Sequence, residues 1–415
     1  MNIKNLLNNR KYKKNFFPTR NKLGIRLHEP TYNYKEIDSV IETLLSSNLT
    51  FGKKTQIFEK KFEKLVNTKN ALYVNSGSSA NLLALSSLAN PYLKNYLKPG
   101  DEVIVPALSW STSVWPIIQN NLTPVFVDVD KKTMNIDPRN IEKAISKKTR
   151  AILIIHTYGN ACNMKEIVKI KKKYNLFLIE DTCEALGTKY NNKYCGTYGD
   201  IGTYSFYFSH HITTGEGGMM VTNNREINNI ANTLRAHGWV RNLPTKEKIK
   251  FEKKYKNIDK KFLFVNLGYN LRGSEIGASI GIEQLKKFKS IISKRRKIAK
   301  KFINFFKSIN HLKLQLETNN SNHSWFGLPI YLNKKIDIKK IRSFLDKKNI
   351  ETRPIICGNI TSQPALKKFK YKIKGNLKNS DFIMKNSFAI GCHQNIEDRN
   401  IKYAQKLLKK IVNES

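Results

Sequence analysis

The sequence predicts an α/β protein built on a mostly parallel sheet. Between about residues 70 and 180, short apolar segments typical of strands alternate with segments of helical periodicity. Such alternation indicates βαβ units, whose right-handed crossovers place helices on both faces of a parallel sheet. From about residue 310 the pattern changes to short strands mixed with helices. This change predicts a second, smaller α+β domain at the C-terminus.

The length supports this division. A chain of 415 residues that is 40% hydrophobic is long enough for two or three domains with sizeable cores. We expect a basic N-terminal arm at 1–25, a large α/β domain at 26–285 and a small α+β domain at 286–415.

The elements of the large domain follow in order. Two helices, at 34–45 and 57–66, are expected before the first strand at 71–74. The alternation then predicts a helix at 80–88, a strand at 102–106, a helix at 111–119, a strand at 124–128, a helix at 139–146, a strand at 151–155, a helix at 164–174 and a strand at 176–180. A strand that begins at Tyr204 leads through a polar loop and a glycine turn to a strand at 219–222.

The remaining elements lie around and beyond the domain boundary. Residues 246–261 form a lysine-rich insert that we interpret as a solvated loop. A long helix over 273–306 is expected to leave the large domain. Strands at 328–331 and 355–356 and helices at 338–348 and 401–412 are predicted for the small domain.

The charge of the chain is strongly positive. Lys and Arg number 74 against 32 Asp and Glu, so the net charge is +42. Such an excess attracts nucleic acid or another polyanion. The lysines are spread over many helix faces and form no single stripe, which favours biased amino-acid usage and no nucleic-acid partner. An anionic substrate such as a nucleotide would still be attracted.

Cysteine usage and hydropathy bear on the compartment. The five cysteines are scattered, and no Cys-x-x-Cys pair occurs, so neither a disulfide framework nor a metal or iron–sulfur site is indicated. The N-terminus lacks the apolar run of a signal peptide, and no stretch approaches the ~18 apolar residues of a membrane span. We expect a cytoplasmic protein with no membrane partner and no metal.

Three motifs follow predicted strands. Residues 75–81, Asn-Ser-Gly-Ser-Ser-Ala-Asn, open a helix, whose free N–H groups suit a phosphate, although ordinary capping by serine explains them equally well. Asp181 ends an apolar strand and could hold a pyridinium nitrogen, or could cap a helix. Trp110 could stack on a planar ligand, or could lie in the core.

Two later segments carry groups that bind anions. Asn270 and Arg272 stand directly before the long helix, and a capped helix start explains them as well. The segment 234–244 contains His237 and Arg241, and arginine can clamp a carboxylate or phosphate. A structural surface cluster is the alternative.

The polar loop after Tyr204 contains two adjacent histidines, His210 and His211. Histidine transfers protons near neutral pH, and loops on a rigid sheet often carry chemistry. A pair of surface histidines in a turn is the alternative interpretation.

Taken together, the order and spacing of these motifs resemble the sugar aminotransferase family of fold type I pyridoxal-phosphate enzymes over about residues 30 to 400. In that family a lysine stands five residues after the serine of a Ser-Phe strand and six before the glutamate of the glycine turn, and it holds the cofactor as a Schiff base. Counting from Ser205 and from Glu216 leads to His210, so this lysine is absent.

An imidazole forms no lasting Schiff base, and only proton transfer remains. With histidine in place of the lysine, the sequence resembles the 3-dehydratase branch of the family, which makes 3-deoxysugars from nucleotide-linked 4-keto-6-deoxysugars. Within that branch it resembles the colitose-pathway type most closely. A sister CDP-ascarylose type adds a cysteine cluster for an iron–sulfur centre, and here the region that directly follows His237, residues 238–356, contains no Cys. Thr213-Thr214-Gly215 is nearer to the sister type, so the nucleotide and the hexose stay open.

The resemblance implies a fold type I large domain and a role for each matching residue. Pyridoxal or pyridoxamine 5'-phosphate would be the cofactor and L-glutamate the amino donor. The expected cofactor-binding residues are Ser78, Ser79 and Ser205 at the phosphate, Asn270 at the phosphate from the second subunit, Trp110 on the ring, Asp181 at the pyridine nitrogen and Glu184 near the ring hydroxyl. His237, Arg241 and Arg272 are expected to orient glutamate or the sugar nucleotide.

His210 is then the catalytic base of a C3 dehydration in deoxysugar and O-antigen lipopolysaccharide biosynthesis, and the protein is expected to be a homodimer with shared active sites. Two other functions stay open. One is a nucleotide-sugar aminotransferase with an unrecognised lysine. The other is a non-catalytic polyanion binder, to which the net charge of +42 points.

Overall fold

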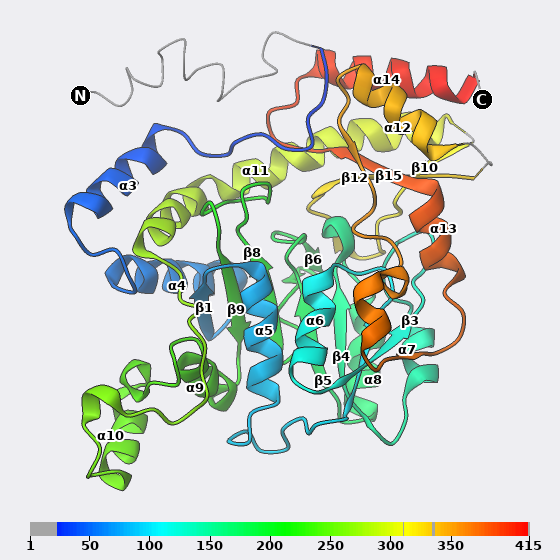
Figure 1. Cartoon of the computed structure of the whole chain (residues 1–415). Helices are drawn as coiled ribbons and strands as arrows, with labels where there is room; N and C mark the ends of the chain where they lie inside the picture. Colours follow the sequence, from blue (N-terminus) through cyan, green and yellow to red (C-terminus); the bar gives the residue numbers. More distant parts are fainter. Residues whose placement is uncertain (1–22, 310, 334–336, 414–415) are drawn as a thin grey trace.

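The structure, a computed structural model, describes residues 23–309, 311–333 and 337–413. Most of the expected N-terminal arm therefore lies outside the described residues. Figure 1 shows a central sheet with helices packed around it and a long helix, α11, that leads from this body toward the C-terminal elements. The predicted class is confirmed: the protein is α/β with a large, mostly parallel sheet.

The large sheet has eight strands in the order β1-β9-β8-β5-β4-β2-β3-β14. Only β9 runs antiparallel to its neighbours, β1 and β8, whereas the remaining pairs are parallel. The bounds are β1 Asn70–Val74, β2 Glu102–Pro106, β3 Thr123–Val127, β4 Thr149–Ile155, β5 Phe177–Asp181, β8 Ile201–Ser205, β9 Gly218–Thr222 and β14 Lys372–Ile373.

Alternating side chains of each strand bury both faces of this sheet. Val103 and Val105 of β2 pack in one core with residues of α5, whereas Ile104 points into a second core with residues of α8. Helices thus cover both faces, as crossovers of one hand require. The bounds are α3 Tyr34–Leu45, α4 Lys53–Val66, α5 Gly77–Leu88, α6 Ser111–Gln119, α7 Pro138–Ala144, α8 Met164–Lys173 and α9 Arg225–Leu234.

The C-terminal part builds a second, antiparallel sheet in the order β10-β12-β15-β13. Its core receives Ile298, Phe302 and Phe306 from α11. The bounds are α11 Glu275–Lys307, β10 Leu312–Leu314, β12 Gly327–Leu332, α12 Ile338–Lys347, β13 Thr352–Arg353, α13 Lys378–Asn386, β15 Ser387–Gly391 and α14 Asp398–Asn413. The expected domain boundary at 285 falls inside α11, and the division stays a prediction.

Two local predictions are wrong, and one small sheet was missed. The strand expected from Tyr204 begins at Ile201 and ends at Ser205, because Phe206 leaves the pairing with β9. The strand expected at 355–356 is a turn in which Ile356 has φ 49°, and β13 lies three residues earlier. A small sheet was not predicted; it consists of β6 Lys189–Tyr190, β7 Lys193–Tyr194 and β11 Ser321–Asn322.

The lysine-rich insert is also not a plain loop. It contains the helix α10, Thr245–Lys254, on which Lys248 and Glu252 form an i, i+4 ion pair, and such pairs support exposed helices. Residues 239–267, which we call the α10 lobe, leave and rejoin the body side by side, since Val265 N donates to Gly238 O at 2.8 Å and Val240 N to Leu263 O at 3.2 Å. In Figure 1 α10 lies at the opposite end of the molecule from α14.

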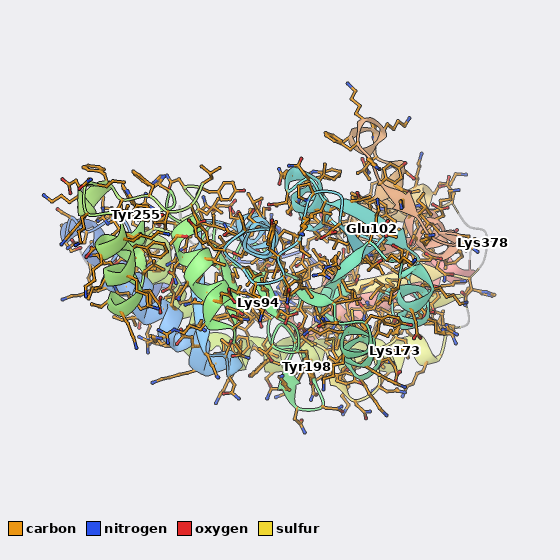
Figure 2. The ribbon with its side chains drawn as sticks, turned by 90° about the horizontal axis from the view of Figure 1, so that it is seen from below. Lys94, Glu102, Lys173, Tyr198, Tyr255 and Lys378 are labelled. Atoms are coloured by element: carbon orange, nitrogen blue, oxygen red, sulfur yellow. The ribbon has the colours of Figure 1, made fainter. Side chains whose placement is uncertain are left out.

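The positive charge is spread over the surface. Figure 2 shows Lys94, Lys173 and Lys378, from three different parts of the chain, well apart in one view. Across the described ranges, no helix has both the length and the apolar character that crossing a membrane demands.

Candidate functional site

A cavity of about 340 Å³ lies where the carboxyl ends of β5 and β8 meet the N-termini of α5 and α6. This is the edge at which open α/β sheets bind ligands. The C-terminal part closes one side of the cavity with Phe326 and Arg353. The expected residues Ser78, Trp110, Asp181, Glu184, Ser205 and His210 all line it.

The N-terminus of α5 forms one end of the cavity. Ser76 caps the helix by accepting a hydrogen bond from Ser79 N at 3.0 Å, and the Ser76 hydroxyl donates to the Ser79 hydroxyl at 2.9 Å. Ser79 is not among the lining residues. Gly77 approaches closely: a Cβ there would lie 2.6 Å from Cβ of Ser205. First-turn amides of a helix have no partner within it. Those of Gly77 and Ser78 therefore face a small concave space that suits an anion.

Asp181 ends β5 and is 4% exposed. Its Oδ2 accepts hydrogen bonds from Asn81 Nδ2 at 2.8 Å and from Ser113 Oγ at 2.7 Å, and its Oδ1 accepts one from Cys183 N at 3.1 Å. Thr203 Oγ1 donates to Asn81 Oδ1 at 2.6 Å, which fixes the direction of that amide. The carboxylate is thus held in one orientation toward the cavity.

The preceding residue, Glu180, points to the other side of the sheet and is fully buried. It accepts hydrogen bonds from the amides of Gly196, Tyr198 and Gly199 and contacts His156 Nε2 at 3.1 Å. Of the Glu-Asp pair, only Asp181 faces the cavity.

Two further predicted residues flank Asp181. Trp110 precedes α6, and with 49% of its surface exposed it does not lie in the core. Glu184 accepts a hydrogen bond from Tyr158 N at 2.8 Å. Burial raises the pKa of Glu184 to about 7, against the opposing effect of Arg353, so this carboxyl can take up or release a proton near neutral pH.

The two histidines of the loop occupy different places. His210 lines the cavity, with its ring 4.9 Å from that of Phe326 and its Nδ1 buried without a hydrogen-bond partner. His211 is fully buried, and its Nε2 contacts Ser324 O at 3.2 Å. Burial, followed by the charges of Arg295 and Arg353, lowers the pKa of His210 to about 3. His210 is therefore a neutral imidazole at the cavity wall.

The other predicted residues gather in a second cluster that does not line this cavity. Arg272 Nη2 lies 3.0 Å from His237 Nε2, and Arg272 also donates to Asn270 Oδ1 at 3.2 Å. Arg241 lies over the Trp239 ring at 4.8 Å. Burial and the nearby Arg241 lower the pKa of Arg272, so the cluster concentrates positive charge on a partly exposed surface.

Sequence reasoning assigned no role to Asn81, Ser113, Phe326 or Arg353. Ser113 lies in the first turn of α6 and Asn81 in the second turn of α5, helices that follow strands, and a polar residue there is a weak signal. Phe326 and Arg353 come from segments more than 100 residues farther along the chain, and only the packing of the small domain brings them to the cavity.

This set of residues fits pyridoxal phosphate. A concave anion site at a helix N-terminus, a flat indole and a fixed carboxylate are the partners of its phosphate, its ring and its pyridinium nitrogen. Gly77 is needed for the phosphate end, since a side chain there would occupy the concave space beside Ser205.

Comparison with known proteins extends these observations. The profile of the DegT/DnrJ/EryC1/StrS aminotransferase family matches residues 30–409. The chain is 42% identical over 379 residues to GDP-4-keto-6-deoxy-D-mannose 3-dehydratase of Escherichia coli O55:H7, covering 91% of this chain and 96% of that protein. It is 41% identical over 393 residues to the protein of the same name from Yersinia pseudotuberculosis, covering 94% and 99%.

A solved structure gives the same relationship in three dimensions. The crystal structure of GDP-4-keto-6-deoxymannose-3-dehydratase with a trapped PLP-glutamate geminal diamine matches with a TM-score of 0.88 and 39% identity, covering 93% of this chain and all of that one.

Proposed function

The chain belongs to the DegT/DnrJ/EryC1/StrS aminotransferase family, and from that membership we propose that it is a pyridoxal-phosphate-dependent sugar 3-dehydratase. It removes the C3 hydroxyl of a nucleotide-linked 4-keto-6-deoxyhexose with L-glutamate as amino donor, in deoxysugar and lipopolysaccharide biosynthesis. One observation carries this proposal: His210 lines the cavity, and no lysine does so among the described residues.

The residues of the cavity have separate tasks in this reaction. The amides of Gly77 and Ser78, with Ser205, bind the cofactor phosphate. Trp110 stacks on the ring and Asp181 holds its nitrogen. When bound, the cofactor supplies an amine for the C4 ketone and a ring that accepts electrons as the C3 hydroxyl leaves.

His210 moves the proton. Its Nδ1 is buried, so we assign the transfer to Nε2, with Nδ1 carrying the other ring hydrogen. A neutral imidazole accepts a proton and then, as an imidazolium, returns it to the departing C3 oxygen. Phe326 packs against the ring and keeps water from that side.

We further propose a homodimer with shared active sites. Asn270, Arg272 and His237 form a positive cluster outside the cavity of their own chain, and such a cluster suits the anionic groups of cofactor or substrate in the partner. Arg241 belongs to the same surface. The cytoplasm is the proposed location, since the five cysteines are unpaired, as is usual in reducing compartments.

The test is incubation of the purified protein with pyridoxal phosphate, L-glutamate and GDP-, CDP- or dTDP-linked 4-keto-6-deoxyhexoses. We expect 2-oxoglutarate, ammonia and a product without its C3 hydroxyl, with the GDP-linked mannose derivative preferred. An amino sugar that retains the C3 hydroxyl would identify an aminotransferase instead. Preference for a CDP-linked sugar would keep the dehydratase and change its substrate.

A further inference from the structure

Arg295 is a buried arginine in the middle of α11. Its side chain is 2% exposed. Its Nη1 donates to the main-chain oxygens of Trp325 at 3.1 Å, Phe326 at 3.2 Å and Cys392 at 2.6 Å, whereas its Nε is buried without a partner. The guanidinium therefore joins α11 to two segments of the small domain.

The second large buried arginine is paired differently. Arg235 contacts the carboxylate of Glu59 at 2.5 Å, so its charge is balanced. The hydrogen-bond partners of Arg295 are uncharged carbonyls, and burial lowers the pKa of Arg295 to about 10. Burying a charge in this way costs free energy, and an apolar side chain of similar size would often be no less stable. The position of Arg295 thus points to a task other than stability.

The carbonyls that Arg295 binds belong to the wall behind His210. Trp325 has φ 55°, in the left-handed region, which is unfavourable for a side chain of this size. Arg295 binds the carbonyl of this residue and that of Phe326, whose ring lies 4.9 Å from the ring of His210. Ser324 O, in the same segment, contacts His211. Arg295 thereby sets where the Phe326 ring meets the imidazole.

The charges around His210 are of both signs. Arg295 reaches it from α11 and Arg353 from the small domain, and both disfavour a second positive charge. The carboxyl groups of Asp181, Glu184 and Glu216 line the same cavity as His210. The other neighbours of His210 are Tyr207, Phe326 and the buried His211. A base must be unprotonated before it acts, so the balance of these charges matters to the reaction.

We propose that Arg295 is a positioning residue: by binding the carbonyls of Trp325 and Phe326 it holds the Phe326 ring against His210 and so fixes the surroundings in which that imidazole titrates. The proposal rests on the proposed function of the site, because it assigns His210 the role of base. The effect of Arg295 on His210 can nevertheless be measured without any substrate.

The experiment compares three variants with the unchanged chain. Arg295→Met removes the charge, Arg295→Lys keeps it on a smaller head group, and Arg296→Met is the matched control. Arg296 is the next residue of α11 and also donates to carbonyls, those of His323, Gly187 and Asn322, each at 3.0 Å. The titration of isotope-labelled histidines is followed by NMR, with the signal of His210 assigned through its loss in His210→Asn.

We expect His210 to stay neutral down to about pH 4 in the unchanged chain and in Arg296→Met. In Arg295→Met its midpoint should rise by about one pH unit toward the free imidazole value, and the acidic limb of the pH–rate profile should move with it. In Arg295→Lys we expect the midpoint to stay low and kcat to fall with KM unchanged, because the shorter lysine side chain places its ammonium nearer to α11 than Nη1 of Arg295 and does not reach all three carbonyls.

An unchanged His210 midpoint in Arg295→Met would overturn the proposal, and so would a midpoint that rises equally in Arg296→Met. If Arg295→Met does not fold, Arg295→Lys decides, since an unchanged kcat there would exclude the positioning role. The NMR result stands apart from the proposed function: if no sugar is dehydrated but His210 titrates as expected, it is the reaction assignment that fails.

Discussion

His210 and His211 are neighbours in the sequence, yet the loop after β8 turns their rings into different surroundings. His210 faces the cavity, and His211 is enclosed and contacts a main-chain oxygen. The spacing from Ser205 and Glu216 was enough to single out His210, because that count needs only one loop. A pattern in the chain could not show that His211 supports the segment carrying Phe326.

Replacing His210 tests its task directly. We expect His210→Asn to lower kcat for dehydration by about 10²- to 10⁴-fold, the usual contribution of a positioned base. His210→Lys should also lose dehydration, and borohydride should now attach the cofactor covalently at position 210, as mass spectrometry would show. Neither the unchanged chain nor His210→Asn should be labelled. Normal dehydration by either variant would exclude the assigned role.

Gly77 tests the phosphate end of the cavity. In Gly77→Ala the new methyl would lie 2.6 Å from Cβ of Ser205, so one of the two must move and the concave space is lost. We expect cofactor affinity to fall at least about tenfold, equivalent to about 1.4 kcal/mol, in an absorbance titration. Full affinity in Gly77→Ala would place the phosphate elsewhere.

At the scale of elements, periodicity located the strands and helices of the large domain well, because each buries a regular face. It failed where local interactions decide the structure. The α10 helix forms in a segment without buried residues, through ion pairs such as Lys248 with Glu252. β13, by contrast, has two residues and exists only through pairing with β15, a partner more than 30 residues away.

The start of α4 depends on a distant carboxylate. Gly52 precedes α4 and provides no side-chain cap, and Glu275 of α11 instead accepts hydrogen bonds from the amides of Gly52 at 2.9 Å, Lys54 at 2.8 Å and Thr55 at 2.8 Å. Glu275 is 2% exposed. Its contact therefore joins two helices that are far apart in the chain.

We expect Glu275→Ala to lower the free energy of unfolding by about 3 kcal/mol, because buried amides lose a charged acceptor. Glu283→Ala, on the same helix, is the control: its carboxylate bonds the exposed Lys286, and a change within about 0.5 kcal/mol is expected. Urea unfolding measures both. Equal effects of the two substitutions would contradict the capping role.

At the scale of the whole molecule, four histidines are buried as neutral rings. Burial lowers the pKa of His210 and His393 to about 3 and that of His211 and His323 well below the usual value. In the unfolded chain each would take up a proton near pH 6.5. Below that pH the unfolded state binds more protons than the native state, so stability decreases as pH falls.

We therefore expect the thermal midpoint to fall steadily between about pH 6.5 and pH 4.5. His393 alone would contribute about 2.7 kcal/mol at the lower end, and His393→Asn should reduce the slope. Glu184, with its pKa raised to about 7, acts in the opposite direction, as do Glu59, Glu216 and Glu317, whose pKa burial also raises. A midpoint that is constant or rises on acidification would contradict this account.

The α10 lobe has a practical consequence. Its two ends are joined by main-chain hydrogen bonds, from Val265 N to Gly238 O and from Val240 N to Leu263 O. The ends therefore lie side by side whatever the length of the segment between them. The entropic cost of such a loop grows only slowly with its length. A fluorescent reporter or an affinity handle spliced in place of 245–262 should leave the sheet folded. In the proposed homodimer, its signal would report on the groups of the partner that approach the neighbouring arginines.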